Sequence, residues 1–108
     1  MELNYNRVHL CGQAADVPTL SHVNHGCAFY RFTLSVLRLS GQADELPVIV
    51  PKALLDAVPV TVGATVTVIG QLRSFNNKSG QGSRLVISVF AHQLTPGGES
   101  PFNQIQLS

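Results

Sequence analysis

Three side chains that can bind a transition metal lie close together near the start of the chain. His22, His25 and Cys27 offer two imidazole nitrogens and one thiolate at short spacing, and zinc sites use such ligands. A structural zinc site needs four ligands, and the sequence has no second His/Cys pair with ligand spacing. The same segment is polar and contains Gly26, which is typical of a turn between strands. We therefore interpret it as a polar turn and expect no metal and no other cofactor.

Nucleophilic catalysis is the second chemistry that the residue types permit. A thiol of Cys11 or Cys27 would need a base such as His9 to activate it. The sequence shows no nucleophile elbow, no oxyanion loop and no paired carboxylates that would accompany such a pair. We therefore expect that the protein is not an enzyme.

The cations of the chain are unevenly distributed. The formal net charge is only +1, from seven Lys and Arg against six Asp and Glu, and this total does not favour a polyanionic partner. Residues 57–98, however, contain Arg73, Lys78 and Arg84 and no acidic residue. Taken alone, these cations are better explained by a solvated hairpin than by contacts with phosphates.

Alternating apolar and polar residues predict five strands and one short helix. The strands are expected at residues 7–13, 29–37, 46–50, 65–75 and 84–92. The helix is expected at residues 52–58, because Pro51 suits the start of a helix and Pro59 ends it. Polar residues, Gly and Pro mark a turn, a loop and a linker at residues 18–26, 76–83 and 96–101.

This order of elements predicts the fold class. Three strands, one short helix and two further strands make an all-β, five-stranded OB-fold, a Greek-key barrel with its helix between strands three and four. We expect several apolar side chains to lie only in the core of this barrel, namely Phe32, Leu34, Val66, Val68 and Ile87.

Four stretches resemble bacterial single-stranded DNA-binding proteins. Residues 6–12 have the Asn-x-Val-x-Leu-x-Gly pattern of their opening strand, and residues 32–36 resemble their second strand. Residues 63–74 resemble the fourth strand and the start of the hairpin loop, and their Gly-Gln-Leu-Arg block is the most specific part. Residues 79–86 continue the match, so that the resemblance covers about residues 5–94.

The resemblance implies an OB-fold without enzymatic activity, assembled into a dimer or tetramer. It implies non-sequence-specific binding of single-stranded DNA along the barrel face and under the loop between strands four and five. Replication, recombination or repair would be the process, with replication or repair proteins as further partners. The charged fraction of 12%, against about 25% in an average protein, agrees with a surface partly covered by other subunits.

Cations and flat side chains, which single-strand binding requires, fall on shared strand faces. Alternation places Arg73 beside Phe75 on one strand and Arg31 beside Phe29 on another. Lys78 is expected in the hairpin loop and Arg84 at the start of the returning strand. We predict that one groove for the DNA backbone and its bases is lined by Arg31, Arg73, Phe75, Lys78, Arg84 and Phe29.

Departures from the family pattern leave a second interpretation open. The family usually carries tryptophans on strands two and three and in the loop, whereas this chain has none and Leu46 stands near one such position. Phe75 is equally consistent with a loop anchor in the core or with a subunit contact. The alternative function is an OB-fold protein-interaction module, similar to primosomal accessory proteins, with weak or no DNA binding.

The last residues repeat the first strand. Residues 103–108, Asn-Gln-Ile-Gln-Leu-Ser, have the pattern of residues 6–11, Asn-Arg-Val-His-Leu-Cys. We divide the chain into an OB domain at residues 1–95 and a linker with an extra strand at residues 96–108. That strand is either the start of a second OB domain or an addition that pairs with its own barrel or with a neighbour's edge.

The sequence also indicates the compartment. No run of eighteen apolar residues predicts a membrane-spanning helix, and the N-terminus has no basic region before an apolar stretch. We expect a cytoplasmic, nucleoid-associated protein without a membrane partner. Cys11 and Cys27 are then expected to be reduced thiols.

Overall fold

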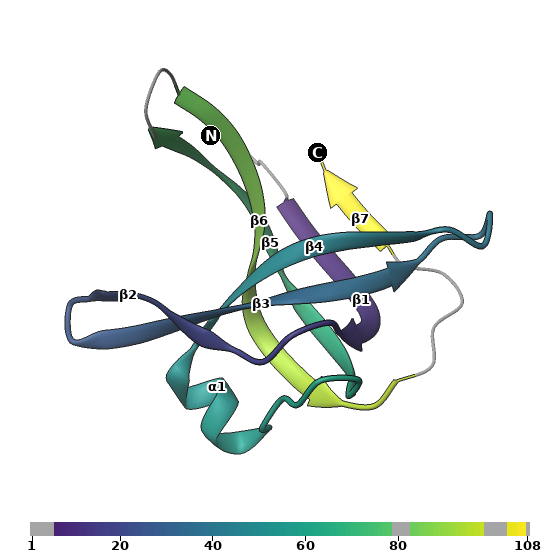
Figure 1. The fold of residues 1–108 in the computed structure, drawn as a ribbon, viewed down its shortest axis with the longest axis horizontal. Helices are drawn as coiled ribbons and strands as arrows, with labels where there is room; N and C mark the ends of the chain where they lie inside the picture. Colours follow the sequence, from purple (N-terminus) through teal and green to yellow (C-terminus); the bar gives the residue numbers. More distant parts are fainter. Residues whose placement is uncertain (1–5, 79–82, 99–103, 108) are drawn as a thin grey trace.

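The protein is a single curved β-sheet that closes on itself (Figure 1). The computed structural model describes residues 6–78, 83–98 and 104–107, and for residues 75–78, 83–85 and 104–107 it describes the backbone only. The elements in chain order are β1 (Asn6–Ala14), β2 (Thr19–Asn24), β3 (Cys27–Leu37), β4 (Ala43–Pro51), α1 (Lys52–Ala57), β5 (Thr65–Lys78), β6 (Ser83–Pro96) and β7 (Gln104–Leu107).

The strand order is that of an OB-fold barrel. The sheet runs β2-β3-β4-β6-β5-β1-β7, and the end of β1 also pairs with β3, which closes the barrel. The pairing of β4 with β6 is parallel and all the others are antiparallel. The predicted fold class is therefore confirmed, and the five predicted strands correspond to β1, β3, β4, β5 and β6.

The interior is filled by the alternate residues of these five strands. Phe32 and Leu34 of β3 and Val66 and Val68 of β5 are at most 1% exposed, as predicted. The other fully buried side chains of similar or smaller size are Val8, Val48, Val50 and Val89. Burying so many branched side chains supplies the main favourable free energy of folding.

Ile87 is not part of this core, and its assignment from the sequence is wrong. It is 55% exposed and pairs with Ser74 across the β5–β6 hairpin. Figure 1 shows that this hairpin extends past the barrel, so the face of the strand that would continue the core meets no opposing layer. Alternation predicts which face a residue occupies, but it does not predict where the opposing layer ends.

The turn predicted at residues 18–26 is also wrong in part. β2 forms an edge strand there, and only His25 and Gly26, with φ angles of 51° and 77°, make the tight turn into β3. All six residues of β2 are exposed. A strand that buries neither face has no apolar alternation, and for this reason its sequence resembles a loop.

Strands β5 and β6 are longer than predicted at their shared hairpin. Asn77 pairs with Arg84 and Lys78 with Ser83, so the ends of the predicted loop belong to the ladder. Residues 79–82, the middle of that loop, lie outside the described residues. At the other end of the hairpin, a β-bulge lets Ala91 and Leu94 both face the core while His92 and Gln93 are exposed.

Two polar side chains, one on β1 and one in the loop after it, add hydrogen bonds between neighbouring parts of the barrel. The Asn6 amide donates to the Leu72 carbonyl oxygen at 2.8 Å and accepts from the Leu72 N–H at 3.0 Å. The Asp16 carboxylate accepts from the backbone N–H of Thr33 at 2.7 Å and from its hydroxyl at 3.0 Å. These bonds connect β1 to β5 and the β1–β2 connection to β3.

The repeated segment at the end of the chain lies beside the segment that it repeats. β7 pairs antiparallel with the first half of β1, from Asn6 opposite Leu107 to His9 opposite Gln104. It thereby continues the sheet beyond β1 (Figure 1).

Candidate nucleic-acid interface

The outer surface of the sheet carries a second group of aligned side chains, turned away from the core. Strand register places Arg31 of β3 opposite Ile49 of β4, and Ile49 opposite Phe90 of β6. Phe90 in turn lies opposite Gln71 of β5. The members of this surface, called the aromatic face below, are His22, Phe29, Arg31, Ile49, Phe90 and Arg73.

Three rings and one cation, supplied by four strands, form a row across the aromatic face. The His22 and Phe29 rings are stacked, with centroids 4.9 Å apart and planes inclined by 11°. Phe29 and Phe90 are tilted neighbours with centroids 6.3 Å apart. The guanidinium carbon of Arg73 lies 4.5 Å from the centre of the Phe90 ring, which is the geometry of a cation–π contact. Phe90 therefore connects the aromatic side chains to the cation.

The buried apolar side chain of Ile49 lies among the residues of the aromatic face. Ile49 is 5% exposed although it does not belong to the barrel core. Its register neighbours Arg31 and Phe90 lie on either side of it on the outer surface. Because Ile49 is buried there, we infer that the outer side chains pack over it and do not extend singly into water.

Gln71 and Gly70 support the contact between Arg73 and Phe90. Gln71 binds the Arg73 guanidinium, and Gly70 leaves room for the Phe90 backbone. With the Gln71 amide turned so that its oxygen faces Arg73, this oxygen accepts from Nε at 2.9 Å and from Nη2 at 2.7 Å. Gly70 lies at the β-bulge, and a Cβ there would overlap the Phe90 carbonyl oxygen and lie 2.7 Å from the Phe90 carbonyl carbon. The strand that carries Phe90 can approach β5 this closely only because residue 70 is glycine.

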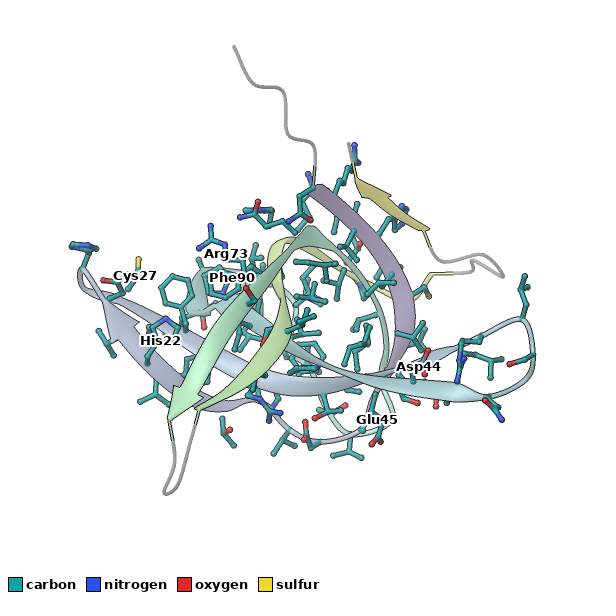
Figure 2. The ribbon with its side chains drawn as sticks, turned by 90° about the horizontal axis from the view of Figure 1, so that it is seen from above. His22, Cys27, Asp44, Glu45, Arg73 and Phe90 are labelled. Atoms are coloured by element: carbon teal, nitrogen blue, oxygen red, sulfur yellow. The ribbon has the colours of Figure 1, made fainter. Side chains whose placement is uncertain are left out.

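The charge of the aromatic face is positive. Two ion pairs are present among the described residues, Arg38 with Asp44 and Lys52 with Asp56, so neither cation of the aromatic face has a carboxylate partner there. Figure 2 shows that Asp44 and Glu45 lie at the opposite end of the barrel from His22, Phe90 and Arg73. The aromatic face therefore combines flat side chains with exposed cations and keeps these acids at a distance.

Three of the six predicted site residues lie on the aromatic face. Phe29 and Arg73 both contact Phe90, and Arg31 is exposed on the same surface. The side chains of the other three predicted residues, Phe75, Lys78 and Arg84, lie outside the described part of the structure. Their backbone belongs to the β5–β6 hairpin, and their roles stay predictions.

Sequence reasoning missed Phe90 and His22. A usable signal existed for Phe90, because alternation along β6 puts it on the face opposite the core residues Val89 and Ala91. His22 gave no such signal, since its segment was interpreted as a turn. Its ring stacks on Phe29 because the bulge in β2 after Leu20 brings His22 opposite Phe29.

Among the described residues, no group of three or more His, Cys, Asp or Glu side chains is placed to hold a metal ion. Cys11 and Cys27 are not joined in a disulfide. No helix within the described ranges has the length and apolar character needed to cross a membrane.

Comparison with known proteins identifies one family. No model of a protein family and no curated protein matches the chain, whereas 159 chains of solved structures do. One of them is the dimeric N-terminal domain of the PriB protein from Thermoanaerobacter tencongensis, with 35% sequence identity and a TM-score of 0.75. The match covers 87% of this chain and 98% of that domain. The chain therefore belongs to the family of the PriB N-terminal domain.

Proposed function

We propose that the protein binds single-stranded DNA across the aromatic face, without sequence specificity. The observation that carries this proposal is the row formed by His22, Phe29, Phe90 and Arg73, in which rings and a cation follow one another across the sheet. Proteins that bind single strands use such rows, because every base has a π-face that can stack and every nucleotide has a phosphate. The location also fits, since OB-folds bind oligonucleotides on the outer face of their second and third strands, here β3 and β4.

The number of cations involved sets the salt dependence of binding. If Arg31 and Arg73 each neutralise one phosphate, the affinity for a single strand falls about 7-fold between 50 and 200 mM salt. If Lys78 and Arg84 of the β5–β6 hairpin contribute as well, the same change lowers the affinity about 50-fold. The slope therefore measures whether Lys78 and Arg84 contact the strand in addition to Arg31 and Arg73.

Fluorescence anisotropy with a labelled oligo-dT strand tests the proposal. We expect binding at micromolar protein in low salt, a fall in affinity with added salt, and much weaker binding to a duplex of the same length. Absence of binding to oligo-dT at micromolar protein would refute the proposal, and so would equal affinity for single strand and duplex.

A protein-interaction module is the second candidate. Leu20 and Val23 of the edge strand β2 are 59% and 62% exposed, and an edge strand with apolar side chains can pair with a partner chain. In that case oligo-dT would bind weakly or not at all, and nuclease treatment would leave a specific protein partner attached. Leu20→Ser with Val23→Ser would remove that partner, whereas Phe90→Leu would not.

A further inference from the structure

The Arg73 side chain is supported by residues of its own sheet. Gln71 precedes Arg73 by two positions on β5, so their side chains share one face of the strand. Phe90 of β6 lies opposite Gln71 in the ladder, which makes it the diagonal neighbour of Arg73. The residue directly opposite Arg73 is Ser88, whose small side chain leaves the long arginine room to reach the Phe90 ring.

The Gln71 amide oxygen binds one particular edge of the Arg73 guanidinium. This edge is formed by Nε and Nη2, which donate to the turned amide oxygen at 2.9 and 2.7 Å. A guanidinium has further N–H groups on Nη1 and Nη2, and the contact with Gln71 leaves them available. They form the fork of donors that matches two oxygens of one phosphate.

Phe90 restrains the same guanidinium from another side. The guanidinium carbon of Arg73 lies 4.5 Å from the centre of the Phe90 ring, yet Arg73 remains exposed to solvent. Arg31, the other cation of the aromatic face, differs in this respect. Within the described ranges, no hydrogen bond or ring contact restrains the Arg31 side chain. Of these two cations, Arg73 is therefore the one that the fold orders in advance.

We propose that Gln71 is a positioning residue for single-strand binding, which holds Arg73 with its Nη1–Nη2 fork available to one phosphate. The proposal rests on the proposed DNA binding and adds to it the residue that orients the cation. An arginine that is already ordered loses little conformational freedom when it binds. Ordering an unrestrained side chain lowers affinity by about 2- to 13-fold, and Gln71 avoids this loss.

Two substitutions of Gln71 separate positioning from charge. Gln71→Leu has a similar size but no acceptor, so the affinity for oligo-dT should fall by about 2- to 13-fold while the slope of log affinity against log salt stays unchanged. Gln71→Glu keeps acceptor oxygens but neutralises the guanidinium, so the affinity should fall and the slope should decrease by about 0.7. Gln13→Leu, the same change at an exposed residue of β1, should leave both quantities at their wild-type values.

The NMR signal of the Arg73 Nε–H group reports the positioning itself. In wild type and in Gln71→Glu this proton should be protected from exchange with water, and in Gln71→Leu it should lose that protection. Loss of stability alone would not produce this change in a variant that keeps the wild-type Tm.

The outcomes distinguish the positioning role from DNA binding. Wild-type affinity in Gln71→Leu, an equal loss in Gln13→Leu, or an unprotected Nε–H in wild type would overturn the positioning role and leave DNA binding intact. A wild-type protein that does not bind oligo-dT would overturn the proposed function, and the positioning role with it, even with a protected Nε–H.

Discussion

Phe90→Leu is the substitution that isolates the stacking surface. Leucine keeps an apolar side chain over Ile49 but has no flat ring. The change removes the ring that lies 6.3 Å from Phe29 and 4.5 Å from the Arg73 guanidinium carbon. It therefore separates the aromatic part of the row from its cation without opening a large hole in the surface.

The expected loss of affinity follows from these contacts. Base–aromatic stacking contributes about 1–3 kcal/mol per base, so losing one stack weakens binding of oligo-dT by about 5- to 150-fold. The folded state loses a free energy of similar size, because an exposed cation–π contact and an aromatic pair contribute about 0.5–1 and 0.5–1.5 kcal/mol. We expect Tm to fall by about 4–8 °C for each kcal/mol lost.

Phe32→Leu is the matched control. It is the same substitution at a ring that is 0% exposed, inside the barrel and away from the aromatic face. It should lower Tm at least as much as Phe90→Leu and leave the affinity for oligo-dT within about 2-fold of wild type, since a 2-fold change is only about 0.4 kcal/mol.

Anisotropy titrations with oligo-dT, carried out well below Tm on wild type, Phe90→Leu and Phe32→Leu, distinguish a loss of stacking from a loss of stability. Wild-type affinity in Phe90→Leu would show that no base stacks on Phe90. Equal loss in both variants would show that the effect comes from stability and not from the surface.

Three further predictions concern the residues around this row. Arg73→Gln should reduce the slope of log affinity against log salt by about 0.7, and an unchanged slope would remove Arg73 from the phosphate contacts. Gly70→Ala should destabilise the fold by about 1–3 kcal/mol, because its Cβ would overlap the Phe90 backbone, and an unchanged thermal melt would contradict that close approach. Asn6→Ala should accelerate hydrogen exchange at the Leu72 amide, whereas Asn6→Asp, which keeps the acceptor oxygen, should leave this amide protected. Equal exchange in both variants would show that the Asn6 side chain does not protect the Leu72 amide.

The barrel was predictable because its strands have one buried face. Phe32 and Leu34 alternate with polar residues, and so do Val66 and Val68, and all four lie in the core. The helix was predicted within one residue at its C-terminal end, because proline marks both ends of the segment. Edge strand β2 was missed for the complementary reason, since it buries neither face and its composition is that of a turn.

The site was only partly predictable, because a surface row is created by register between strands distant in sequence. Alternation placed Arg73 on an outer face, but only the ladder between β5 and β6 shows that Phe90 is the ring beneath it. The stack of His22 on Phe29 depends on a bulge in a strand that the sequence did not reveal. Pattern analysis finds faces, whereas neighbours across a sheet require the register.

The most direct test of the central claim is a map of the DNA contact on the protein. In ¹H–¹⁵N NMR spectra titrated with oligo-dT, we predict that the largest shifts fall on the amides of Phe29, Arg31, Arg73 and Phe90. The amides of α1 and of the β3–β4 connection, residues 38–42, should shift little. Shifts concentrated on α1 or that connection, with the aromatic face unchanged, would contradict the account.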